Sequence, residues 1–165
     1  MTFRLVDSLP KIWFENLIEA HRVGQISKIE YYQRIEKYLG AGVGEKWLAN
    51  SKVAQMVQDT LKYFHEKRYL LHSWVIMPNH VHMLISILPG NNLPDIVRTI
   101  KSYTARKANI KIGRCGPFWQ RDFFDRYIRN IKHFDYTVAY IEYNPVVAGL
   151  CKQPSEWQFG SAFGE

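Results

Sequence analysis

The chain has 165 residues, 47% hydrophobic and 22% charged, which is enough apolar material for one folded domain spanning residues 1–165 and argues against a disordered chain. A formal net charge of +7 favours a polyanionic partner, although a merely basic surface would give the same sum.

No apolar run reaches about 18 residues, and the start lacks a secretory signal, so we expect a cytoplasmic protein without membrane contact. Cys115 and Cys151 fit no metal or redox spacing and are expected as free thiols.

The first half of the chain predicts a strand, three helices and a hairpin. The strand is expected at 2–6 and two glycine-ended helices within 8–24 and 27–44. Ser51 can cap a helix over 52–67, which carries an apolar stripe. Two apolar runs at 68–77 and 80–87, joined by Pro78-Asn79, should pair as antiparallel strands.

The second half predicts two more helices with a glycine-broken segment between them. Helical spacing covers 93–110, the segment 111–130 reads as a loop with a short strand or two, and a last helix over 132–144 should stop at Pro145. This order of elements is compatible with an α+β ferredoxin-like sandwich, in which helices cover one face of an antiparallel sheet.

Two histidines, His80 and His82, lie inside the apolar run 77–88. A strand sends residues i and i+2 to the same face, so both imidazoles should lie side by side, with Cα atoms about 6–7 Å apart. Such a pair can hold one metal ion from two sides. The alternative is a pair of structural histidines in a core strand.

Tyr136, Tyr140 and Asn144 share one face of the last predicted helix, because positions i and i+4 stack. Asn144 could give a carbonyl oxygen to a hard cation such as Mg²⁺ or Mn²⁺, and Tyr140 would lie beside the same ion. Glu142 lies about 200° from Tyr140 around the helix and should not share the site. The competing interpretations are a core or interface tyrosine and, for Asn144 before proline, a simple helix end.

The positive charge is concentrated between residues 98 and 132, where ten basic side chains face two acidic ones. Interleaved aromatic residues make a nucleic-acid surface the favoured interpretation over a solvated helix face with core aromatics. The candidate DNA-binding residues are Arg98, Lys101, Arg106, Lys107, Arg114, Trp119, Gln120, Arg121, Arg126 and Arg129. Trp119 can stack on an unpaired base or belong to the core.

Three ordered motifs, "MPNHVHMLI", "GPFWQRDFFDRYIRN" and "YIEYNPVVAGL", resemble those of the single-tyrosine HUH transposases, and most of all the REP-associated tyrosine transposases. The resemblance runs from Thr2 to about Trp157. It implies a ferredoxin-like sheet of the HUH endonuclease type, with His80 and His82 as metal ligands, Asn144 as the third ligand and Tyr140 as the nucleophile. Tail residues 157–165 match the family ending only loosely.

The resemblance further implies an enzyme that cuts and transfers single-stranded or hairpin DNA through a 5′-phosphotyrosine link, with Mg²⁺ or Mn²⁺ as cofactor, acting as a monomer or a homodimer. Two alternatives stay open. One is a domesticated, non-catalytic nucleic-acid-binding protein. The other is a small metallohydrolase of another substrate, which would need a carboxylate near the histidines.

Overall fold

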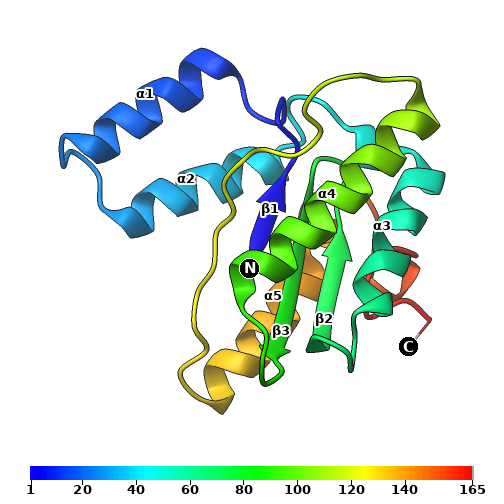
Figure 1. The fold of residues 1–165 in the computed structure, drawn as a ribbon. Helices are drawn as coiled ribbons and strands as arrows, with labels where there is room; N and C mark the ends of the chain where they lie inside the picture. Colours follow the sequence, from blue (N-terminus) through cyan, green and yellow to red (C-terminus); the bar gives the residue numbers. More distant parts are fainter. Residues whose placement is uncertain (165) are drawn as a thin grey trace.

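Three antiparallel strands form the centre of the computed structural model, which describes residues 1–164 (Figure 1). They are β1 (Thr2–Arg4), β2 (Tyr69–Ile76) and β3 (His80–Ile87), in the spatial order β1-β3-β2. The predicted hairpin is confirmed, since β2 and β3 pair with Ile76 opposite Val81 across the Pro78-Asn79 turn. The side chains of His80, His82 and Leu84 share one face of β3, and those of Val81 and Met83 share the other.

Irregular segments extend this sheet at both edges. On the outer side of β1, the amide of Thr2 donates to Phe124 O (2.7 Å) and that of Gln120 donates to Arg4 O (2.8 Å). On the outer side of β2, the amide of Ile76 donates to Phe159 O (2.8 Å). The predicted strand character between 111 and 130 therefore takes the form of isolated bridges along β1.

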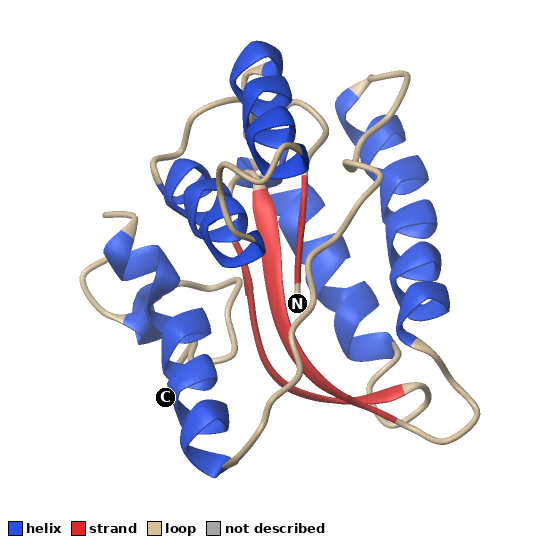
Figure 2. Ribbon diagram, turned by 90° about the vertical axis from the view of Figure 1, so that its left-hand side faces the viewer, coloured by secondary structure: helices blue, strands red, loops and turns tan. Residues whose placement is uncertain are grey.

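Helices cover both faces of the sheet (Figure 2). Helices α3 (Ser51–Tyr63) and α4 (Leu93–Ile112) pack on the face of Val81 and Met83, as the ferredoxin-like prediction requires. Helix α5 (Ile131–Val147) lies on the opposite face, where Ile141 packs against Leu84. The α+β fold class is confirmed, but the expectation that all helices share one face is wrong for α5, because the face that carries the histidines is also apolar at its other end.

The N-terminal helices α1 (Lys11–Arg22) and α2 (Lys28–Gly40) form a hairpin beside β1 (Figure 1). A capping box begins α2: Ser27 Oγ accepts from the Glu30 amide, and the Glu30 carboxylate accepts from the Ser27 amide. The two helices share a small apolar cluster of their own, built around Leu17 and Leu39. Two short 3₁₀ turns, Trp47–Ala49 and Pro154–Glu156, complete the secondary structure of the described residues.

Several helix ends differ from the predictions, and the helix expected over 52–67 ends at Tyr63. Asn50 caps α3 in place of Ser51, because its Oδ1 accepts from the amides of Lys52 and Val53. Helix α5 does not stop before Pro145 but continues to Val147. Pro145 removes one amide donor, yet its ring is buried on the same stripe as Ile141, and this packing outweighs the lost bond.

Among residues 1–164, no helix is both long and apolar enough to cross a membrane.

Lys101 on α4 fixes the irregular segment beside β1. Its Nζ donates to the carbonyl oxygens of Gln120 (2.6 Å), Arg121 (2.8 Å) and Asp122 (3.4 Å). Burial lowers the pKa of Lys101 to about 8, opposed by the charge of Asp122. The ammonium predicted to contact phosphate is thus used within the protein, where it holds the segment that runs along β1.

Replacing Lys101 with methionine should lower the free energy of unfolding by about 1–3 kcal/mol, because three carbonyl groups lose a charged donor. Urea denaturation measures this loss. Lys107→Met on the exposed side of the same helix is the matched control and should change stability by less than about 0.5 kcal/mol. Equal stability of the two variants would contradict the bracing role of Lys101.

Candidate active site around the histidine pair

The two imidazoles predicted to share a face of β3 meet ring to ring. His80 Nε2 and His82 Nε2 are 3.0 Å apart, and the rings lie edge to face with centroids 4.6 Å apart. The two residues are only 1% and 2% exposed. The strand periodicity therefore delivers two nitrogen atoms to one buried point.

Asn79 sets the orientation and tautomer of His80. The Asn79 Nδ2 group donates to the carbonyl oxygens of Leu39 (3.2 Å) and Val43 (3.4 Å), so Oδ1 must be the atom that faces His80. Because Oδ1 only accepts, the His80 Nδ1 at 2.6 Å carries the proton and Nε2 keeps a free lone pair. A free Nε2 lone pair is the form of imidazole that binds a metal ion.

Thr2 of β1 fixes the orientation of the His82 ring but not its tautomer. Thr2 Oγ1 lies 2.7 Å from His82 Nδ1, and a hydroxyl can either donate or accept there. Burial lowers the pKa of both imidazoles well below the ordinary value, and the charge of the other ring (for His80) or of the N-terminus (for His82) adds to the effect. Both rings are therefore neutral near pH 7.

The third group at this point is the carboxylate of Glu36 on α2, which the sequence analysis did not single out. Glu36 Oε2 lies 3.4 Å from His82 Nε2, and donor atoms of Glu36, His80 and His82 all fall within 4.8 Å of one another. The available signal was weak: Glu36 adjoins the buried Ile35 on the inner side of an amphipathic helix. Nothing local in the sequence tells that this helix packs beside β3.

Helix α5 brings Tyr140 to the same place. Its hydroxyl donates to Glu36 Oε2 (2.8 Å), and its ring centroid lies 5.6 Å from that of His82. Burial raises the pKa of Tyr140, and the charge of Glu36 and the hydrogen bond to it raise it further, while a hydrogen bond with Asn144 opposes the shift. Asn144 is thus placed beside the phenol, one turn further along α5.

The remaining polar side chains on this part of α5 make no recorded contact with the histidine pair among the described residues. Tyr136 is 71% exposed, and the Glu142 carboxylate accepts from Ser161 Oγ (2.9 Å) on the tail side of the helix. The exclusion of Glu142 by helical angle agrees with this placement.

This set of side chains fits a divalent cation. Two neutral imidazole nitrogen atoms and one carboxylate converge, and both imidazoles are held from behind by hydrogen bonds at Nδ1, as is usual for metal-binding histidines. Imidazole nitrogen atoms suit first-row transition-metal cations, and the carboxylate oxygen adds a harder donor.

The predicted DNA-binding residues separate into an exposed group and a structural group. The exposed side chains are those of Arg98, Arg106, Lys107, Arg121, Arg126 and Arg129, while Gln120 is half-buried. Arg114 stacks over the Trp47 ring (3.7 Å) and donates to Pro117 O (2.6 Å). Trp119 is 7% exposed, and its indole N–H donates to Thr104 Oγ1 (2.8 Å), which places it in the core.

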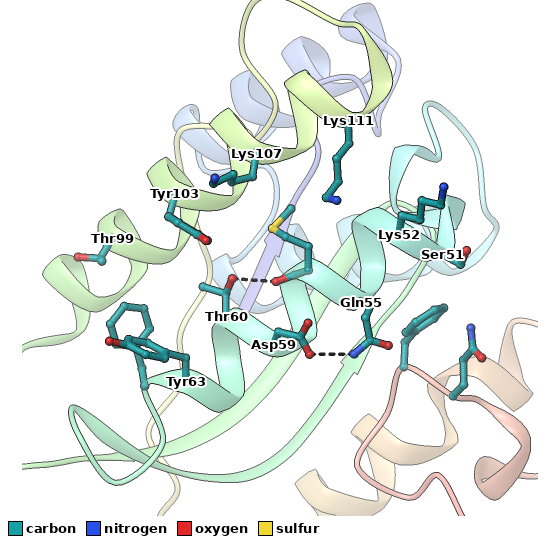
Figure 3. A pocket seen from close by; sticks show the side chains of 14 residues that line it. Ser51, Lys52, Gln55, Asp59, Thr60, Tyr63, Thr99, Tyr103, Lys107 and Lys111 are labelled. Carbon is teal, nitrogen blue, oxygen red and sulfur yellow. Dashed lines mark hydrogen bonds between the residues drawn. The ribbon is translucent and has the colours of Figure 1, made fainter.

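The exposed basic residues do not all face the histidine pair. Arg98, Arg106 and Lys107 project from α4, on the opposite side of the sheet, where Lys107 also lines a hollow of about 1050 Å³ between α3 and α4 (Figure 3). Arg121, Arg126 and Arg129 follow the segment that runs past β1 to the start of α5 (Figure 1). The second group lies on the segment that precedes α5, the helix that carries Tyr140.

Comparison with known proteins points to one family. The sequence model described as "Transposase IS200 like" matches residues 45–144, from the loop after α2 to Asn144. The REP-associated tyrosine transposase of Escherichia coli (strain K12) is 29% identical over 102 residues, which cover 61% of this chain and 59% of that protein. A relative from Haemophilus influenzae is 30% identical over 97 residues, 52% of this chain and 54% of its own length.

A solved structure agrees with these matches. The structure of a REP-associated tyrosine transposase bound to a REP hairpin superimposes with a TM-score of 0.57 and 26% identity, over 71% of this chain and 68% of that one. The chain spans little more than half the length of the curated relatives that it matches. Since the family model covers well over half of its residues, the chain belongs to the IS200-like transposase family.

Proposed function

We propose that the protein is a metal-dependent endonuclease and strand transferase for single-stranded DNA at hairpins or repeats, acting in DNA transposition. The observation that carries this proposal is the meeting of the Tyr140 phenol with two buried imidazoles and a carboxylate of the same chain. A phenol at a metal-binding cluster is an unusual arrangement for a structural core and a useful one for phosphoryl transfer.

His80 and His82 would hold Mg²⁺ or Mn²⁺ through Nε2, with Glu36 or Asn144 supplying oxygen. When bound, the cation would neutralise charge on the scissile phosphate and orient it for in-line attack. Asn79 and Thr2 would keep both imidazoles aimed at it, which is the role of groups behind metal ligands. Glu36 is the third ligand that the geometry favours, and Asn144 is the one that the family resemblance implies.

Tyr140 would attack the phosphorus through its phenolic oxygen, displacing the 3′-oxygen of the neighbouring nucleotide. The products are a 5′-phosphotyrosine link and a free 3′-hydroxyl, so one phosphodiester replaces another and the step can run backwards. The phenol must lose its proton, and Glu36 already accepts a hydrogen bond from it. Because Glu36 also raises the pKa of Tyr140, the phenol stays neutral until positive charge reaches the carboxylate.

The DNA partner would approach along the segment between β1 and α5. Arg121, Arg126 and Arg129 on this path are exposed and available to phosphate groups. Binding of a REP hairpin by a structural relative supports a hairpin substrate. Tyr140 reaches the histidine pair of its own chain, which is the arrangement that a monomer acting in cis would use.

Glu36 also keeps a second candidate open. A metallohydrolase of another substrate would need a carboxylate beside the histidines, and Glu36 provides one. That enzyme would use water as the nucleophile and would have no need of Tyr140. The two functions therefore differ in the product that they leave on the protein.

Replacing Tyr140 with phenylalanine should abolish the covalent protein–DNA adduct, because the nucleophilic oxygen is lost while the ring remains. The measurement is gel electrophoresis, under denaturing conditions, of a labelled hairpin with single-stranded flanks after incubation with Mn²⁺. Binding of the uncut hairpin should stay within about twofold of the unmodified protein, because the substitution removes no cation.

Tyr136→Phe, one turn earlier on α5 and exposed to solvent, is the matched control and should still form the adduct. An adduct formed by Tyr140→Phe would assign the nucleophile to another residue. Strand cutting without any adduct in the unmodified protein would favour the water-using hydrolase.

Glu36→Gln and Asn144→Ala separate the two possible third ligands. If Glu36 binds the cation, its glutamine variant should weaken Mn²⁺ binding by about tenfold to a hundredfold, since a charged ligand becomes neutral, whereas Asn144→Ala should change it by about twofold or less. Titration calorimetry with Mn²⁺ measures both. The reverse order of effects would make Asn144 the ligand and leave Glu36 as a partner of the phenol alone.

A further inference from the structure

A hollow of about 300 Å³ adjoins the histidine cluster on the side of β1. It lies between β1, α2 and the segment 120–124, and Thr2 and Glu36 line it. These two residues also contact His82, through Nδ1 and Nε2 respectively. The hollow therefore borders the histidine cluster through these two side chains, while the imidazoles and Tyr140 are not part of its lining.

A buried arginine without a carboxylate partner lines this hollow. Arg4 is only 7% exposed, and its guanidinium lies 4.3 Å from the Phe14 ring centre. In the described part of the chain its one recorded hydrogen bond runs from Nη1 to Ser8 Oγ (3.2 Å), and no carboxylate lies within 4 Å of it. Burial lowers the pKa of Arg4 to about 10, so the group is still a cation near pH 7.

The Arg4 nitrogen atoms that make no hydrogen bond are not fully buried, since Asn109 Oδ1 is the buried side-chain polar atom without a partner among residues 1–164. They therefore stay open to a ligand in the hollow that Arg4 lines. A guanidinium has five N–H donors, and most of those of Arg4 are left without a recorded acceptor. A ligand that offers two acceptors side by side would use these donors.

The rest of the lining is aromatic with an acidic end. Tyr32 and Phe124 stack with ring centroids 3.9 Å apart, and Tyr31 lies edge-on to Tyr32. Asp122 and Gln120 border the hollow on the side of the irregular segment. Flat aromatic walls, a donor fork and a carboxylate acceptor together are the elements of a nucleobase site.

We propose that this hollow receives one unpaired guanine of the DNA strand, next to the phosphate that Tyr140 attacks. The inference rests on the proposed function and adds a base for which the enzyme is selective. Arg4 would donate to guanine O6 and N7, and Asp122 would accept from N1–H and the 2-amino group. Adenine and cytosine present an amino group to the arginine, and thymine lacks the adjacent acceptor pair. Guanine is the base that offers acceptors to Arg4 and donors to Asp122.

The test measures binding without chemistry. Fluorescent twelve-residue thymidine strands, either plain or with one central guanine, adenine or cytosine, are titrated with Tyr140→Phe protein in Mn²⁺. The guanine strand should bind roughly tenfold more tightly than the others, as expected for a bidentate arginine contact. Replacing the guanine by 7-deazaguanine or by hypoxanthine removes one contact each and should lose most of that preference.

Arg4→Met and Arg4→Lys, each placed in the Tyr140→Phe protein, should bring the guanine strand to the level of plain thymidine, since neither side chain carries the donor fork. Arg22→Met, an exposed arginine on α1, is the matched control and should keep the preference. If the methionine variant does not fold, the lysine variant and the base analogues still decide the matter.

The outcomes separate this inference from the proposed function. A covalent adduct that forms equally on plain and guanine-containing strands, with equal binding of both, overturns the guanine site and leaves strand cutting intact. A guanine preference that depends on Arg4, in a protein that forms no adduct with any strand, supports the site although the strand-cutting proposal fails.

Discussion

The central constraint in this structure is the fixed direction of one amide side chain. Asn79 donates to two carbonyl groups near the end of α2, and this leaves only its oxygen to face His80. The histidine must then carry its proton on Nδ1 and turn a bare Nε2 toward His82. Three hydrogen bonds thereby connect the hairpin turn, the end of α2 and the His80 ring.

The same contacts position the N-terminal helical hairpin. The carbonyl groups of Leu39 and Val43 that bind Asn79 belong to the end of α2 and the loop after it, so this helix cannot move without disturbing the β2–β3 turn. Glu36 lies one helical turn before Leu39, and its carboxylate is close to the His82 imidazole. Although the family match begins only at residue 45, this hairpin supplies both the carboxylate of the histidine cluster and one wall of the neighbouring hollow.

Contacts that follow from a repeat could be predicted from the sequence, and those that depend on chain packing could not. The period of two placed His80 and His82 on one face, and the period of a helix placed Tyr140 beside Asn144 and excluded Glu142. Glu36 meets Tyr140 across 104 positions of the chain, and no local pattern encodes that meeting. Lys101 and Trp119 show the same limit. Both were predicted to contact DNA, but in the structure they form hydrogen bonds within the protein. The sequence of a basic segment is the same for either role.

The Glu36 carboxylate links the Tyr140 phenol to the histidine pair. Without a cation, this carboxylate holds the phenolic proton of Tyr140 by a direct hydrogen bond and disfavours the phenolate by its charge. If His80 and His82 hold a divalent cation, Glu36 Oε2 would be an available ligand, since it is the carboxylate oxygen nearest His82 Nε2. Positive charge held there would offset the negative charge of Glu36 that disfavours the phenolate, and Asn144, whose hydrogen bond favours the phenolate, lies beside the phenol. The protonation of the Tyr140 phenol would thus depend on whether a cation occupies the histidine cluster.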